Sequence, residues 1–165
     1  MSVLDREFHE SLGYWIFAAG YAIETALNEE LAPLGITYRQ VQILAALLAQ
    51  GQASQTELAE TLRIEPSGVV RLLDRMERAG WIQRESDPID RRRKIVRPTD
   101  KALPVWREIK ERALAARRRG LHGISDEQVV ATREVLRQIR HNLVGDSLPF
   151  PLTPCRDEQP ASTRT

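Results

Sequence analysis

Apolar residues recur every three to four positions through the first thirty residues, which is typical of an amphipathic helix. The pattern predicts one long helix from Leu4 to Leu31, and Pro33 and Gly35 bring it to an end. Its apolar stripe consists of Leu4, Phe8, Leu12, Trp15, Ile16, Ala19, Ile23, Ala26, Leu27 and Leu31.

Capping patterns predict where further helices begin. In a capping box, a Ser or Thr side chain accepts a hydrogen bond from the backbone N–H three residues later. The Glu or Gln side chain at that later position accepts one from the backbone N–H of the Ser or Thr. Another helix is expected to begin with Pro66 in its first turn and to be closed by Gly80. The boxes are Thr37–Gln40, Ser54–Glu57 and Ser125–Gln128, and their helices are expected to end at Gly51, Leu62 and about Val144.

A β-hairpin is predicted after Gly80. The runs Trp81 to Glu85 and Lys94 to Arg97 are strand-like, and Asp87-Pro-Ile-Asp90 between them has the residue types of a tight turn. Arg91-Arg92-Arg93-Lys94 makes the tip of this hairpin basic. Taken alone, such a basic run is better explained as a solvated turn; together with the order of the helices and the arginines of the preceding helix, a functional role is the better explanation.

The order helix, helix, helix, strand, strand is that of a winged helix-turn-helix, in which the third helix reads DNA. After the hairpin, Thr99 is expected to cap a helix that reaches about Leu121, and Pro104 in its first turns to delay the regular start. The fold class is therefore mainly α with a small β-hairpin wing.

Composition and charge narrow the function classes. The chain has 165 residues and a formal net charge of +1, which by itself does not indicate a nucleic-acid binder. A single cysteine excludes an intrachain disulfide framework, which fits a reducing compartment, so a cytoplasmic protein is expected. Its uncharged stretches are shorter than the roughly 20 residues of a membrane span, so no membrane partner is expected.

Counted by segment, the charge is uneven. Residues 1–50 carry two basic and six acidic side chains, residues 51–123 carry seventeen and eleven, and residues 124–165 carry five and six. The middle segment is therefore basic, with a net charge of +6, between two acidic flanks.

The third helix of the winged unit has two distinct faces. An apolar stripe at i, i+3, i+4 and i+7 predicts the buried face, and three arginines point away from it. In a major groove, Ser67, Gly68 and Arg71 would reach base edges first, while Arg75 and Arg78 would meet phosphates. The stripe is Val69, Leu72, Leu73 and Met76.

These motifs resemble the MarR-type (multiple antibiotic resistance regulator) transcriptional regulators, from roughly Leu12 to Val144. The most specific match is Asp87-Pro-Ile-Asp-Arg-Arg-Arg-Lys94, which looks like the wing signature of that family; Gln55-Thr-Glu-Leu-Ala59 and Arg71-Leu-Leu-Asp-Arg75 support it. The resemblance implies that Arg92 enters the minor groove with Asp90 as its partner. The DNA-binding residues expected are Ser67, Gly68, Arg71, Arg75, Arg78, Asp90, Arg91, Arg92, Arg93 and Lys94.

Two positions depart from the family pattern. This chain has Pro98 just before Thr99, where a leucine is usual in the family, and the proline is expected to bend the chain where it leaves the wing. Val70 stands where a threonine is common in the recognition helix, which is expected to alter base preference or one phosphate contact.

The terminal helices are long and apolar along one stripe, and their natural use is to pack against a second copy of the chain. A two-fold dimer would place two recognition helices about 34 Å apart on a palindromic operator. The alternative is that these helices close a monomeric core. The expected interface residues are Leu4, Phe8, Leu12, Leu136, Ile139 and Leu143. Residues 1–36 and 100–145 then form a dimerisation region, 37–99 a DNA-binding region, and 146–165 a Pro-rich, flexible tail.

Four aromatic residues gather in an uncharged part of the first helix: Tyr14, Trp15, Phe17 and Tyr21. Core or dimer packing explains them most simply. The alternative is that they line a pocket for a small aromatic or lipophilic effector between the dimerisation helices and the winged unit, a crevice that the resemblance implies.

Other chemistry is not indicated. His9, His122 and His141 lack metal-ligand spacing, and Cys155 lies in the Pro-rich tail, so neither a metal site nor a thiol sensor is expected. Without a phosphate loop or a nucleophile arrangement, we expect no enzyme and no cofactor.

The function expected is therefore a sequence-specific DNA-binding regulator, most simply a repressor, whose DNA affinity responds to an effector. A ligand-independent architectural DNA-binding protein and a winged-helix protein-interaction module remain alternatives.

Overall fold

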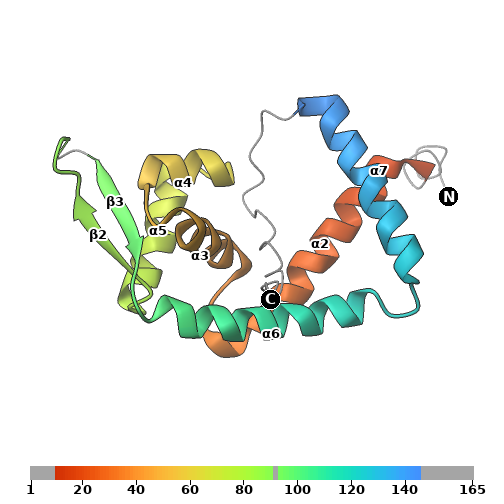
Figure 1. Cartoon of the computed structure of the whole chain (residues 1–165), viewed down its shortest axis with the longest axis horizontal. Helices are drawn as coiled ribbons and strands as arrows, with labels where there is room; N and C mark the ends of the chain where they lie inside the picture. Colours follow the sequence, from red (N-terminus) through yellow and green to blue (C-terminus); the bar gives the residue numbers. More distant parts are fainter. Residues whose placement is uncertain (1–9, 91–92, 146–165) are drawn as a thin grey trace, which may run out of the picture.

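The computed structural model describes residues 10–90 and 93–145, and it has the expected fold class: it is mainly helical, with a small antiparallel sheet at one end (Figure 1). In chain order the elements are α2 (Leu12–Leu31), the 3-10 turn η1 (Ala32–Leu34), α3 (Tyr38–Gln50), β1 (Ala53–Ser54), α4 (Gln55–Leu62), α5 (Pro66–Arg78), β2 (Ile82–Ser86), β3 (Lys94–Pro98), α6 (Ala102–Gly120) and α7 (Asp126–Val144). The winged unit lies at one end of the molecule, α7 at the other, and α6 runs between them (Figure 1).

All three predicted capping boxes form. Thr37, Ser54 and Ser125 each accept a hydrogen bond from the backbone three residues later, and the Gln or Glu side chain there accepts one from the capping residue's own backbone N–H. Pro66 lies in the first turn of α5. Gly80 has φ +76°, the left-handed conformation that closes a helix and that glycine adopts most readily.

The prediction of one continuous helix from Leu4 is wrong at Ser11. Glu10 is helical, but the backbone of Ser11 is extended, with φ −75° and ψ 122°, and α2 begins only at Leu12. Serine competes with the helix for backbone hydrogen bonds and favours the position just before a helix, so it interrupts an apolar period that continues through it. Leu4 and Phe8 lie outside the described residues.

Thr99 does not cap a helix, contrary to the sequence-based prediction. Its hydroxyl donates to the carbonyl of Gly80 at 2.6 Å, its backbone N–H donates to the carbonyl of Trp81 at 2.9 Å, and α6 begins later, at Ala102. Because Pro104 has no N–H, it fits the first turn of this later helix, where backbone donors have no helical partner.

The sheet has three strands in the order β1-β3-β2, one more than the predicted hairpin. β1 is only Ala53 and Ser54, which are opposite Val96 and Ile95 of β3. β2 pairs with β3 along its whole length, from Ile82 opposite Pro98 to Ser86 opposite Lys94. Pro98 therefore ends the ladder in register.

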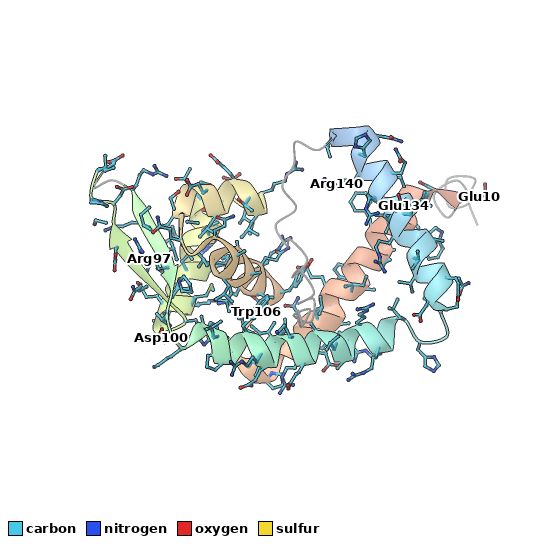
Figure 2. The ribbon with its side chains drawn as sticks, viewed as in Figure 1. Glu10, Arg97, Asp100, Trp106, Glu134 and Arg140 are labelled. Carbon is cyan, nitrogen blue, oxygen red and sulfur yellow. The ribbon has the colours of Figure 1, made fainter. Side chains whose placement is uncertain are left out.

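The core lies within the winged unit, around α3. Ile43, Leu44 and Leu47 are fully buried there, and α5 contributes Val69, Leu73 and Met76. From α6, Ala102 and Ile109 close the core, and Trp106 packs partly buried against it (Figure 2). The start of α6 is thus part of the winged unit, while its other end lies outside it.

The end of α2 packs against α6. Arg112 of α6 donates to the backbone carbonyl of Glu30 at 3.3 Å, and Arg119 forms ion pairs with Glu29 at 2.8 Å and Glu30 at 3.4 Å. Charged side chains of α6 therefore bind the carboxyl end of α2, where helix carbonyls lack a helical partner.

Within the described ranges, no helix is by itself long and apolar enough to cross a membrane, and only the bent pair Leu12–Leu34 with Tyr38–Gln50 meets that test when taken together.

Candidate nucleic-acid interface

The helix α5 presents the two faces that its sequence predicts. Val69, Leu73 and Met76 have no exposed surface, and Leu72 is partly buried. The three arginines of α5 are exposed, as expected for side chains opposite the buried stripe: Arg71, Arg75 and Arg78. The Nε of Arg78 donates to the carbonyl of Asp74 at 3.1 Å, so this guanidinium lies along its own helix.

The amino-terminal turn of α5 combines an exposed and a packed residue. Ser67 is exposed, whereas Gly68 is partly buried and follows closely the turn between α4 and α5. A Cβ on Gly68 would lie 2.9 Å from Cγ2 of Ile64, too close for an ordinary contact. The absence of a side chain at Gly68 therefore lets the turn pack against α5, a role that its predicted contact with base edges did not include.

The turn that follows β2 is held by local hydrogen bonds of Asp87 and Asp90. The carboxylate of Asp87 accepts from the backbone N–H of Ile89 at 2.8 Å and of Asp90 at 3.3 Å, and the two backbone bonds keep the pKa of this carboxyl below its ordinary value. The N–H of Arg93 donates to the carbonyl of Asp90 at 2.9 Å. The Asp-Pro turn predicted from the sequence thus forms at Asp87–Asp90, where side-chain and backbone hydrogen bonds close it.

The described basic residues of the wing lie on its outer surface. Arg93 and Lys94 are exposed, and the Nζ of Lys94 donates to Oγ of Ser86 on the facing strand at 2.8 Å. Arg91 and Arg92 lie outside the described residues, as does the expected pairing of Arg92 with Asp90.

Arg93 connects the wing to the start of α4. Its Nη2 lies 3.3 Å from Oε1 of Glu57, the same side chain whose Oε2 accepts from the N–H of Ser54 at 2.7 Å. Backbone and side-chain hydrogen bonds to Ser54, and then the charge of Arg93, hold the pKa of Glu57 below its ordinary value. One carboxylate therefore serves the capping box and orients a basic wing residue.

Arg84, which the sequence analysis did not select, connects the wing to the recognition helix. On β2, its N–H donates to Oε1 of Glu77 at 3.1 Å, its Nε donates to Oε2 of Glu77 at 3.0 Å, and its Nη2 lies 2.7 Å from Oδ1 of Asp74. The side-chain hydrogen bond from Arg84 lowers the pKa of Glu77. Asp74 and Glu77 are i, i+3 neighbours on α5, but a partner on a strand beyond Gly80 leaves no signal in the helical period.

A groove of about 640 Å³ lies beside the first half of α5, and we call it the basic groove. It is lined by Arg39, Arg63, Ile64, Glu65, Gly68, Arg71, Leu72 and Arg75. Arg39 and Arg63, which lie outside the recognition helix, were not selected from the sequence. Four arginines against one carboxylate make the lining of the groove positively charged.

The four aromatic residues considered for an effector pocket are exposed in the single chain. Phe17 and Tyr21 have 80% and 76% of their surface exposed, and the rings of Tyr14 and Trp15 meet edge to face with centroids 5.4 Å apart. These side chains are thus not part of the core of one chain.

A separate apolar cavity of about 600 Å³ lies between α2 and α6. Alanines from both helices line it, with Arg117 and Arg119 at its edge, and it includes none of Tyr14, Trp15, Phe17 and Tyr21.

The candidate interface residues that are described lie at the end of the molecule away from the wing. No residue of α7 is buried, and Leu136 and Leu143 are 42% and 78% exposed. Ile139 is partly buried, and Leu12 of α2 is 56% exposed. In one chain, therefore, α7 closes no core of its own.

Across residues 10–90 and 93–145, no three His, Cys, Asp or Glu side chains are grouped so that they could hold a metal ion.

Comparison with known proteins gives a match over the winged unit and a fold match over most of the chain. Residues 34–93 match the sequence model of the MarR family. A MarR-family transcriptional regulator from Rhodococcus sp. RHA1 is 28% identical, with a TM-score of 0.71 over 84% of this chain and 95% of that one.

Two further solved structures are similar. CouR from Rhodococcus jostii RHA1, bound to p-coumaroyl-CoA, is 27% identical, with a TM-score of 0.68 over 80% of this chain and 93% of that chain. A MarR variant from E. coli, complexed with operator DNA, is 21% identical and shares the fold, with a TM-score of 0.72 over 84% of this chain and 99% of that chain.

Proposed function

We propose, from the premise that this chain carries the winged helix-turn-helix of the MarR family, that it is a DNA-binding transcriptional regulator. The observation that carries the proposal is α5, whose three arginines are exposed opposite the buried Val69, Leu73 and Met76. A helix of this kind fits the major groove, where an arginine fork matches the two acceptors of guanine.

The regulator binds a palindromic operator as a homodimer. Residues 37–99 serve as the DNA-binding region, and residues 1–36 and 100–145 serve as the dimerisation region. The helix α7, which has no buried residue and lies at the far end of the molecule from the wing, supports this division (Figure 1). Two-fold symmetry then sets the two recognition helices about one turn of DNA apart, roughly 34 Å.

Within each half-site, Ser67, Gly68 and Arg71 lie at base edges, while Arg75 and Arg78 bind phosphates. The wing, with Asp90 and the basic run Arg91 to Lys94, follows the neighbouring minor groove, where Arg92 responds to groove width and negative potential. The hydrogen-bonded turn at Asp87 supports this role, because a preformed turn from Asp87 to Asp90 loses little entropy on binding.

The regulator acts as a repressor whose DNA affinity is lowered by a small aromatic or lipophilic effector. Two features support an effector: the ligand-bound CouR among the similar structures, and the apolar cavity between α2 and α6. The exposed cluster of Tyr14, Trp15, Phe17 and Tyr21 is the second candidate surface. An effector that binds a conformation with the wrong spacing of recognition helices would lower DNA affinity by its preference for that conformation.

The test is a titration of the protein on its own upstream DNA and on a scrambled duplex, at several salt concentrations. We expect specific binding to exceed nonspecific binding by roughly 10³ or more. Arg71→Ala should reduce the sequence preference of binding at particular base pairs, whereas Arg75→Ala should lower the affinity for all duplexes by a similar factor. Equal affinity for both duplexes would instead favour an architectural protein, and no binding to either would favour a protein-interaction module.

Effector binding is tested separately, by the fluorescence of Trp15 in a variant with Trp81 and Trp106 replaced by Phe. A panel of phenolic and other lipophilic acids should change this fluorescence and release the operator DNA. If neither signal responds to the panel, effector control is abandoned while DNA binding stands.

A further inference from the structure

The basic groove receives arginines from three different elements. Arg71 and Arg75 come from α5, Arg39 from the first turn of α3, and Arg63 from the turn between α4 and α5. Glu65 is the one carboxylate among its lining residues. The positive surface beside the recognition helix is therefore wider than that helix.

Arg63 occupies a backbone position that does not favour it. It ends α4 with φ 51° and ψ 46°, the left-handed region that glycine and asparagine enter more readily than a long side chain. Its backbone N–H donates to the carbonyl of Glu60 at 3.2 Å, so the turn itself needs only the backbone. The arginine side chain contributes a positive charge at the edge of the groove instead.

Arg39 is shared between the groove and the helix α2. Its Nε lies 3.8 Å from Oε1 of Glu24, and its Nη1 donates to Oε1 of Gln42 at 3.3 Å. The side chains of Arg39 and Glu24 are 46% and 38% exposed. A long, solvated ion pair of this kind is weak and readily exchanged for another anion.

The backbone around this pair is held in place. Oδ1 of Asn28, one turn after Glu24 on α2, accepts from the N–H of Tyr38 at 2.8 Å. Burial, and then the charge of Glu24, raises the pKa of Tyr38, which therefore stays neutral beside this corner. Because α2 is fixed to the start of α3, Glu24 stays within reach of Arg39 while the arginine side chain can turn toward the groove.

We propose that Arg39 and Arg63 bind the phosphates of one DNA strand beside the recognition helix, and that Glu24 competes with phosphate for Arg39. The proposal rests on the proposed DNA-binding function and extends it in two ways. The phosphate contacts reach beyond α5 and the wing, and a carboxylate on a proposed dimerisation helix limits DNA affinity directly.

The first experiment compares Arg39→Gln and Arg63→Asn with wild-type protein on operator and scrambled duplexes. Asparagine suits the left-handed backbone at Arg63, so this variant removes the charge without straining the turn. Each variant should lower the affinity for the operator duplex and for the scrambled duplex by the same factor. Each variant should also reduce the slope of the logarithm of the binding constant against the logarithm of the salt concentration by about 1.8. Each phosphate contact contributes about 0.9 to this slope, and a dimer carries every arginine twice.

Arg137→Gln is the matched control. Arg137 lies on α7, far from the groove, where it pairs with Glu134 at 2.6 Å on the surface, and its removal changes the net charge equally. The control should leave both affinity and slope unchanged. If Arg39→Gln and Arg63→Asn behave like this control, or change only the preference among sequences, the phosphate role is wrong.

The second experiment tests the competition by Glu24. Glu24→Gln should raise affinity for every duplex about two- to fivefold, the range of an exposed ion pair. The gain should vanish when Arg39→Gln is already present, and Glu29→Gln, whose partner is Arg119, should give no such gain. An equal gain with and without Arg39 would overturn the competition.

The proposed function and this inference fail differently. A wild-type protein that binds neither duplex contradicts the proposed function and the inference together. A wild-type protein that binds its operator, with unchanged affinity in the two arginine variants, contradicts the inference alone.

Discussion

Arg84 joins the wing to the recognition helix with one side chain. Its Nε and Nη2 both donate to Oε2 of Glu77, its backbone N–H donates to Oε1, and Nη2 also pairs with Asp74. The side chain of Arg84 is 20% exposed, whereas those of Asp74 and Glu77 are 44% and 38% exposed, so solvent screens part of the interaction. Geometry, more than charge, gives this cluster its value, because it fixes the angle between β2 and α5.

Arg84→Met should lower the free energy of unfolding by about 1 kcal/mol, because a guanidinium bound by two carboxylates contributes more than an ordinary surface pair while remaining partly solvated. Urea denaturation measures it. Arg97→Met is the control, since Arg97 meets Glu85 only at 3.9 Å on the exposed side of the sheet, and it should change stability little. Equal losses in the two variants would show that the cluster has no special role.

The same cluster predicts a dependence on pH. Arg84 lowers the pKa of Glu77 in the folded chain, so the stability from this carboxylate is present above its ordinary pKa of 4.5 and is lost as the pH falls through the lower folded value. Urea denaturation at pH 5 and pH 3 should therefore show a smaller loss in Arg84→Met than in wild type. An identical loss would mean that Glu77 titrates normally.

At this scale, the exposed arginines of α5 could be predicted because helical period alone places them opposite Val69, Leu73 and Met76. Arg84 could not, because its partners lie across a turn and on another element. Arg39 and Arg63 were missed for the same reason, since the groove they share exists only once α3, α4 and α5 pack together.

The wing and the recognition helix also meet through Thr99. Its hydroxyl reaches the carbonyl of Gly80, where α5 has just ended, and its N–H extends the ladder to Trp81. The two ends of the β2-β3 hairpin are thereby held together at the base of the wing. The segment between β3 and α6 therefore stabilises the base of the hairpin, and α6 begins only after it.

Thr99→Val should lower the free energy of unfolding by about 1 kcal/mol, because it removes one hydroxyl hydrogen bond while keeping the branched shape. Thr99→Ser retains the hydroxyl and should cost less than the valine variant. Urea denaturation of both variants checks this. A valine variant that is as stable as wild type would show that the hydroxyl hydrogen bond contributes nothing to stability.

Among the elements, the capped helices were the most predictable, because a capping box is a local signal that Thr37, Ser54 and Ser125 carry by themselves. β1 was not predictable, since two residues are too short to show alternation. The break at Ser11 was missed because the apolar period passes through it, and Thr99 was misassigned because its partner, Gly80, lies across the hairpin.

For the whole molecule, the distribution of burial is as informative as the fold. The core is confined to the winged unit and the parts of α2 and α6 that touch it, while α7 has no buried residue. The predicted fold class was confirmed because element order specifies it. Assembly cannot be derived from one chain, since an interface is buried only in the presence of its partner.

Leu143→Glu should convert the proposed dimer to a monomer, because it places a charge at an interface position that is 78% exposed in one chain. Light scattering after size exclusion at low micromolar concentration checks this. Gln138→Glu is the control, since Gln138 lies on the opposite side of α7 and pairs with Asn142 at 2.7 Å. A Leu143→Glu protein that remains dimeric would place the interface elsewhere.

The helix α6 connects the wing base to the far end of the molecule in one unbroken span (Figure 1). Nineteen residues make it about 28 Å long, at about 1.5 Å per residue. If a rigid helix of this length tilts by about 7° about one end, its other end moves by about 3.4 Å, which is the rise of one base pair. In the proposed dimer, a small change in packing between the two chains would therefore displace each winged unit by about one base-pair step along the proposed operator.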